Sequence, residues 1–189
     1  MTNKTREPVV AGQFYPADSQ KLRATVETYL ARAPQWPNRA LRALIAPHAG
    51  YQFSGPTAGA AFCELRNRAA FSRVVVLAPS HRSPSPTISV GTFKEYATPL
   101  GGTSVDVRAC EALIRAGEPF SADTKPHNGE HSLEVQLPFL QIALPEAELV
   151  PLVCGPLDAT RLRNAAAVLR EQLWRPDTLW VISTDFTHF

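Results

Sequence analysis

Residues 74–81 read Val-Val-Val-Leu-Ala-Pro-Ser-His, a β-branched apolar run followed by a proline and a histidine. Residues 41–48, Leu-Arg-Ala-Leu-Ile-Ala-Pro-His, repeat the arrangement, and a third apolar run, 179–183, leads through Asp185 to His188. Short apolar runs of this kind predict buried strands. Ligands of open α/β sheets bind beyond the carboxyl ends of the strands. We therefore expect imidazoles from distant parts of the sequence to converge at one edge of a sheet.

Helical segments alternate with these strands along the chain. The spacing of apolar and capping residues predicts five helices. The first two are 18–32, with a cap at Asp18 or Ser19, and a helix after the cap Ser54, with Pro56 in its first turn. The other three are 106–116, from the cap Asp106 to the stop Gly117, then 131–144, with a kink at Pro138, and a helix after the cap Asp158. The alternation predicts an α/β fold, with a mostly parallel sheet covered by helices on both faces.

Two segments are predicted to lie outside this regular pattern. Residues 82–104 are rich in proline and glycine, which predicts a long loop with one short edge strand near 87–90. Residues 149–153 form a further apolar strand, and Pro151 within it favours an edge position or a bulge.

Composition limits the classes of function. A chain of 189 residues with a formal net charge of +2 and no clustered basic stripe predicts one domain without a nucleic-acid partner. No apolar run reaches the ~20 residues that a membrane span needs, and the polar start of the chain does not resemble a signal peptide. Cys63, Cys110 and Cys154 are odd in number and far apart, which is typical of a reducing, cytoplasmic compartment.

Two acid–histidine pairs add to the strand-end histidines. His131 lies between Glu130 and Glu134, and either carboxylate could orient its ring or accept its proton. Asp185 and His188 are three residues apart and could form a general base. Imidazoles beside carboxylates are typical of transition-metal sites.

Two nucleophilic alternatives stay open at this point. A serine hydrolase would need an activated serine, and Ser80 and Ser132 each neighbour a histidine in sequence, but the chain has no G-x-S-x-G motif. Cys154 follows a strand and precedes a glycine, which is a suggestive position, although a buried cysteine more commonly acts as a small apolar residue.

Several motifs, taken in order, resemble those of the MEMO family, known in bacteria and archaea as AmmeMemoRadiSam system protein B. These motifs are Val10-Ala11-Gly12-Gln13-Phe14-Tyr15-Pro16, Ala46-Pro47-His48-Ala49-Gly50-Tyr51, Pro79-Ser80-His81, Glu130-His131-Ser132-Leu133-Glu134 and Ser183-Thr184-Asp185-Phe186-Thr187-His188. The resemblance implies a fold similar to that of the class III extradiol (LigB-type) dioxygenases. It also implies that His48 and His81 bind iron or copper, and that a redox role accompanies the metal. His131, Asp185 and His188 match other polar residues of that pocket and are our catalytic candidates.

One feature of the family has no counterpart in this sequence. The family's third metal ligand is a cysteine well beyond the Asp-Phe-Thr-His motif, and Cys154 does not match its position. We therefore expect residues 1–189 to be a single MEMO-like domain that lacks its C-terminal part.

Two alternative functions use the same pocket. One is a non-catalytic module that binds a peptide or small anion through Arg82. The other is a dioxygenase that acts on an aromatic diol.

Overall fold

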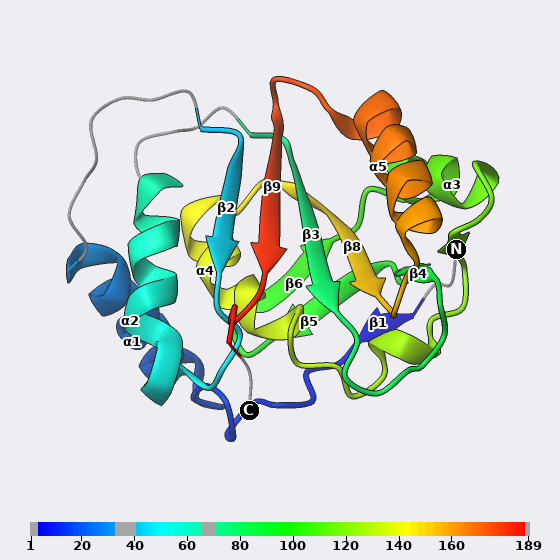
Figure 1. The fold of residues 1–189 in the computed structure, drawn as a ribbon. Coiled ribbons are helices and arrows are strands. Elements are labelled where there is room, and N and C mark those ends of the chain that lie inside the picture. The colour runs from blue at the N-terminus through cyan, green and yellow to red at the C-terminus, as the bar shows by residue number, and fades with distance from the viewer. Residues whose placement is uncertain (1–3, 33–40, 66–70, 188–189) are drawn as a thin grey trace.

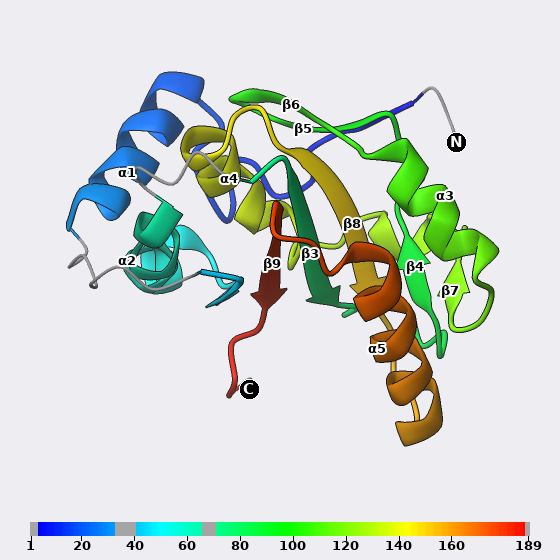
Figure 2. The same cartoon turned by 90° about the horizontal axis from the view of Figure 1, so that it is seen from above.

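The main sheet is mostly parallel, as the sequence predicts. A computed structural model describes residues 4–32, 41–65 and 71–187. Within these ranges a six-stranded sheet has the order β2-β9-β3-β8-β4-β7 (Figure 1, with β7 labelled in Figure 2). Its strands are β2 (Ala43–Ala46), β9 (Thr178–Ser183), β3 (Arg73–Pro79), β8 (Glu148–Cys154), β4 (Ile88–Val90) and β7 (Phe120–Ser121). The first four run parallel to one another, β4 is antiparallel to β8, and β7 is parallel to β4.

Helices cover both faces of this sheet. Helix α4 (Leu137–Ala143) lies over one face, and α1 (Ser19–Arg32) and α2 (Tyr51–Phe62) pack beside it. Helix α5 (Ala159–Leu173) lies on the opposite face and contacts α3 (Val107–Arg115) (Figure 2). Because the central strands are buried on both faces, their sequences are continuous apolar runs. The α/β fold with a covered, mostly parallel sheet is therefore confirmed.

The prediction that Pro151 marks an edge or a bulge is wrong. Strand β8 lies between β3 and β4, and Pro151 is paired with Val76 of β3. The carbonyl of Pro151 accepts a hydrogen bond of 3.0 Å from the Gly91 N–H, just past the end of β4. In a strand the nitrogen and the carbonyl of one residue point to the same side, so the Pro151 nitrogen, which carries no proton, also faces β4. The missing donor therefore falls where the ladder with β4 ends, and the strand stays in the sheet.

The prediction for 82–104 is confirmed for the short strand near 87–90, which is β4, but wrong in its edge position and in the long loop around it. This segment contains β4 and a hairpin of β5 (Glu95–Thr98) and β6 (Gly101–Ser104). The hairpin joins β1 (Thr5–Arg6) in a second, three-stranded sheet of order β1-β5-β6. Glycine has no side chain, so a strand that contains glycine lacks part of the apolar pattern by which strands are recognised in a sequence. Here Gly102 lies under the Glu95 side chain of the paired strand, whose carboxylate would be 2.4 Å from an added Cβ and would have to move aside.

Two helix starts differ from the predictions. Helix α2 begins at Tyr51 after Gly50, so Ser54 is not its cap and Pro56 lies inside it. Residues 131–133 are not helical: a 3₁₀ turn, η3 (Glu134–Gln136), precedes α4, and Pro138 lies in the first turn of α4 instead of kinking a longer helix. The reason is local, because the Glu130 carboxylate accepts the backbone N–H groups of the two residues after it.

The other helix signals are confirmed. Asp106 caps α3 by accepting from the Ala109 N–H, and Gly117 follows that helix with a φ of +81°. Asp158 caps α5 by accepting from two backbone N–H groups of its first turn. The remaining described elements are the 3₁₀ turns η1 (Cys63–Leu65) and η2 (Lys125–His127). Within the described ranges, no helix combines the length and apolar character needed to cross a bilayer.

Candidate metal centre

The parallel strands bring three predicted site residues to one edge of the sheet. His48 follows β2, His81 follows β3 and Asp185 follows β9, all beyond the carboxyl ends of their strands. These ends lie together at the lower edge of the sheet in Figure 1. The convergence predicted from the sequence is therefore present for these residues. His188 lies outside the described residues.

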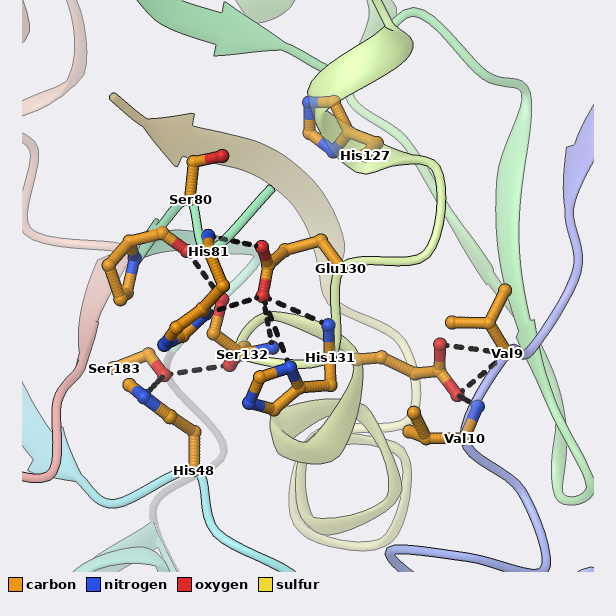
Figure 3. Close-up of polar contacts among 12 residues, drawn as sticks. Val9, Val10, His48, Ser80, His81, His127, Glu130, His131, Ser132 and Ser183 are labelled. Carbon is orange, nitrogen blue, oxygen red and sulfur yellow. Dashed lines mark hydrogen bonds and ion pairs between the residues drawn. The ribbon is translucent and has the colours of Figure 1, made fainter. Parts of the chain in front are cut away.

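Three imidazoles meet at this edge. Each of His48, His81 and His131 offers a ring nitrogen, and these nitrogens lie within 4.8 Å of one another. The ring centroids are 5.2 Å apart for His48 and His81, 5.7 Å for His48 and His131, and 4.6 Å for His81 and His131. Figure 3 shows the rings close together although they come from three separate segments of the chain. The structure thus adds His131 to the two histidines expected to bind metal.

Hydrogen bonds fix the tautomer of His48. The Ser183 hydroxyl donates to the Ser132 carbonyl at 2.7 Å and accepts from the Gln136 amide at 3.0 Å. Its single proton is therefore used, so its 2.9 Å contact with Nδ1 of His48 must be a bond donated by the imidazole. Nδ1 then carries the proton, and Nε2 carries the lone pair that a metal would need. The ring itself is buried.

Glu130 performs the same task for His81. Its Oε1 lies 2.9 Å from Nδ1 of His81, and its Oε2 accepts the His81 backbone N–H at 2.7 Å. Burial would raise the pKa of this carboxyl, but hydrogen bonds from His81 and Ser132 outweigh burial and lower the pKa below its usual value. Because an ionised carboxylate only accepts, Nδ1 of His81 is a protonated nitrogen, and in the neutral ring Nε2 is the atom with the lone pair.

His131 is held between the same carboxylate and an aromatic ring. Its Nδ1 lies 3.4 Å from Oε1 of Glu130, and its ring centroid lies 4.8 Å from that of Phe14. Burial lowers the pKa of His131 and outweighs the neighbouring carboxylate of Glu130, which would raise it. The ring is therefore neutral near pH 7, which is the form that binds metals.

The donor set fits a transition metal. Metal–imidazole bonds are about 2.0–2.1 Å long, so three such nitrogens around one tetrahedral ion lie about 3.4 Å apart. The side chains of His81 and His131 are 28% and 18% exposed, so small rotations of these rings can close the cluster around the buried His48. Hydrogen bonds from ligand histidines to a carboxylate or hydroxyl behind them are typical of metal sites.

Asp185 contacts the cluster through His48. Its Oδ1 accepts the His48 backbone N–H at 2.6 Å, and its Oδ2 lies 3.6 Å from Nε2 of the same residue. The predicted bond between Asp185 and the His188 ring falls outside the described residues. What the structure establishes is a carboxylate oxygen 3.6 Å from the His48 nitrogen that faces the histidine cluster.

The interpretation of Glu134 as a partner of His131 is wrong. Glu134 is fully buried and pairs with Arg6, accepts the Tyr15 hydroxyl at 2.6 Å, and accepts the N–H groups of Val9 and Val10 at 3.0 Å. Glu134 therefore holds the N-terminal arm, residues 6–15, in place, and Phe14 of this arm packs against His131. Sequence spacing could not separate the roles of the two glutamates, since their partners lie far away along the chain.

Comparison with known proteins identifies the family. Residues 6–189 match the model of the family described as Memo-like protein. The chain belongs to this family. It is 37% identical over 197 residues to a MEMO1 family protein of Methanopyrus kandleri, covering 97% of this chain and 69% of that protein. It is 35% identical over 189 residues to a MEMO1 family protein of Aquifex aeolicus, covering 98% of this chain and 68% of that protein.

Family membership confirms the resemblance seen in the motifs, and the α/β architecture agrees with the LigB-type fold expected from it. The match includes every candidate site residue of this Memo-like chain, from His48 to His188.

The structure disfavours the cysteines and Ser132 as nucleophiles. Burial raises the pKa of the Cys154 thiol to about 11, so it is protonated near pH 7 and weakly nucleophilic. Cys63 and Cys110 are buried in the core. The Ser132 hydroxyl donates to the Pro79 carbonyl at 2.7 Å, which leaves its proton engaged with the backbone.

Proposed function

We propose that this Memo-like chain binds one transition-metal ion, iron or copper, through His48, His81 and His131, and that the bound ion has a redox role. The observation that carries the proposal is the set of three imidazole nitrogens within 4.8 Å of one another. When bound, such an ion would supply one-electron oxidation and reduction. Imidazole suits iron and copper but also zinc and nickel, so the choice of iron or copper follows from the resemblance to the family.

The surrounding residues prepare the imidazoles for this task. Ser183 and Glu130 hold the Nδ1 protons of His48 and His81, so each ring presents Nε2 without rearranging its proton. Glu130 also brings one negative charge behind two neutral ligands, which strengthens their donation to a cation. The cluster is therefore organised before any ion arrives.

Asp185 is the proposed proton carrier of the site. Its Oδ1 accepts the His48 N–H, and its Oδ2 lies 3.6 Å from Nε2 of His48, the nitrogen that would hold the metal. A carboxylate in this position can accept a proton from a bound substrate and return it. We include His188 as its expected partner, in line with the Asp-Phe-Thr-His motif.

Metal analysis of purified protein tests the centre. We expect the wild type to retain about one iron or copper ion per chain, and His48→Ala, His81→Ala and His131→Ala each to lose it, as for a three-nitrogen site. His127→Gln is the control, because His127 is buried and bonds Tyr96 and Ser89 instead. Circular dichroism checks that each variant is folded. Equal metal content in the wild type and the folded site variants would contradict the proposal.

The redox role has its own test. Copper-loaded protein should lose its cupric electron paramagnetic resonance signal with ascorbate and regain it in air, over repeated cycles. Metal that stays bound but never changes oxidation state would refute the redox role and leave the binding site intact.

A second candidate is a non-catalytic module that binds a small anion. The observation in its favour is an open pocket of about 590 Å³ next to His81 that includes Arg82. Binding that persists unchanged after the metal is stripped, together with absent redox cycling, would favour this candidate over the first.

A further inference from the structure

An open pocket adjoins the histidine cluster. Its volume of about 590 Å³ is that of a site for a small organic molecule. The loop after β3 forms one wall and the loop after β8 forms the other; the lining residues are Pro79, Ser80, His81, Arg82, Ser83, Pro84, Cys154, Gly155 and Pro156. His81 belongs both to this lining and to the cluster. A molecule in the pocket can therefore reach the proposed metal ion.

The only charge among the lining residues, apart from any on His81, is positive. Arg82 is exposed, and no carboxylate of the described residues forms an ion pair with it. Its side chain lies over Gly129, where an added Cβ would be 3.5 Å from the Arg82 Cδ and Nε. The guanidinium is thus placed between the pocket and the segment that carries Glu130 and His131. Guanidinium groups bind carboxylates and phosphates with two parallel hydrogen bonds.

Two hydroxyl groups strengthen the preference for an anion. Ser80 Oγ accepts the Ser83 N–H at 3.0 Å, and Ser83 Oγ accepts the Ser85 N–H at 3.3 Å. Both hydroxyls act as acceptors in these turns, which leaves their protons to be donated to a ligand. The polar side of the pocket therefore offers donors at Ser80, Arg82 and Ser83.

Prolines from both loops give the pocket an apolar part that defines the rest of the ligand. Pro79 at the end of β3, Pro84 of the loop after β3 and Pro156 of the loop after β8 supply these apolar, rigid surfaces. The two loops are held together by backbone bonds from Ser80 N–H to the Cys154 carbonyl at 2.8 Å and from Gly155 N–H to the Thr87 carbonyl at 2.9 Å. A Cβ on Gly155 would lie 1.8 Å from the Ser85 carbonyl oxygen. The loops therefore approach as closely as backbone allows, and the pocket is preformed.

We infer that the substrate of this site is a small organic anion, with a carboxylate or phosphate group bound by Arg82, Ser80 and Ser83, and an apolar body against the prolines. Its other end reaches the histidine cluster beside His81. The inference rests on the proposed function for the meaning of that contact, whereas the anion pocket itself can be tested without metal.

The test compares three probes of similar shape: phenylacetate, phenyl phosphate and the neutral phenylacetamide. We expect at least one anion to bind saturably in isothermal titration, and phenylacetamide to bind at least about tenfold more weakly, because the amide cannot form the charged bidentate pair. The probe that binds more tightly decides between carboxylate and phosphate. Equal affinity for the anions and the amide, or no binding of either anion, would overturn the inference.

Two variants assign the binding to Arg82. Arg82→Gln should weaken binding of the preferred anion by about ten- to hundredfold, the range for loss of a charged hydrogen-bonded pair, with metal content unchanged. Arg163→Gln, an exposed arginine on α5, is the matched control and should have no effect. An Arg82→Gln variant that binds as tightly as the wild type would refute the inference.

The two proposals fail separately. If the wild type retains no metal but metal-free protein binds an anion through Arg82, the metal centre is wrong and the anion site stands. If metal is retained but no anion binds, the reverse holds.

Discussion

Replacing Glu130 with glutamine should weaken metal binding more than it weakens the fold. Oε1 of Glu130 accepts from Nδ1 of His81 and from the N–H groups of His131 and Ser132, and Oε2 accepts from the His81 N–H. A glutamine offers one carbonyl oxygen and turns the other position into a donor. In its better orientation the amide nitrogen faces the His81 N–H, and that bond is lost.

The magnitude follows from these contacts. Loss of one hydrogen bond to a charged group costs about 1.5–3 kcal/mol, so we expect Glu130→Gln to lower the free energy of unfolding by about that amount. Removing the carboxylate behind two ligand histidines should lower metal affinity by about 10–100-fold. Unfolding in urea measures the first effect, and competition with a chelator of known affinity measures the second.

Glu134→Gln is the matched control. Glu134 is as deeply buried as Glu130, but it bonds Arg6, Tyr15 and the N-terminal arm. The Glu134→Gln variant should lower the free energy of unfolding at least as strongly as Glu130→Gln, because the buried Arg6 loses its charged partner. Its metal affinity should change much less. Unchanged metal affinity in Glu130→Gln, or an equal loss in both variants, would refute the role assigned to Glu130.

Three further predictions follow from other contacts. Ser183→Ala removes the acceptor of the His48 Nδ1 proton and should lower metal affinity by about tenfold or more, measured by the same chelator competition; unchanged affinity would contradict the assigned tautomer. Burial lowers the pKa of His127 to about 4, so below pH 6.5 the unfolded chain binds a proton on this residue that the folded chain does not bind. The free energy of unfolding, measured in urea, should therefore fall by about 3 kcal/mol as the pH drops from about 6.5 to 4. His127→Gln should remove most of this pH dependence, and the same pH dependence in the variant would refute the prediction. Leu179→Ala, at a fully buried position of β9, should lower the free energy of unfolding by about 2–5 kcal/mol, whereas Leu162→Ala, at a half-exposed position of α5, should change it by less than about 0.5 kcal/mol; similar effects of the two would contradict the described core.

The sequence predicts the strands and the edge where the site forms because both follow from local patterns. Val74–Ala78 and 179–183 are apolar runs whose burial needs no knowledge of their neighbours. Asp106 and Asp158 cap helices through bonds to residues two or three positions away. Signals of this range can be found in the sequence alone.

Other features depend on contacts that the sequence does not display. The position of Pro151 inside the sheet depends on where β4 ends, and the β5–β6 hairpin depends on its pairing with β1. The division of labour between Glu130 and Glu134 depends on partners 49 and 128 residues away. Adjacency in sequence places Glu130 beside His131 and helical spacing places Glu134 there, and only the fold separates their roles.

The central claim is that three imidazoles from separate segments bind one ion. Pulsed electron paramagnetic resonance of the copper-loaded chain tests it most directly, because it counts the imidazole nitrogens around the metal. We predict three in the wild type and two in any of His48→Ala, His81→Ala or His131→Ala that still retains copper. A signal that shows the same imidazole count in the wild type and in these variants would contradict the account.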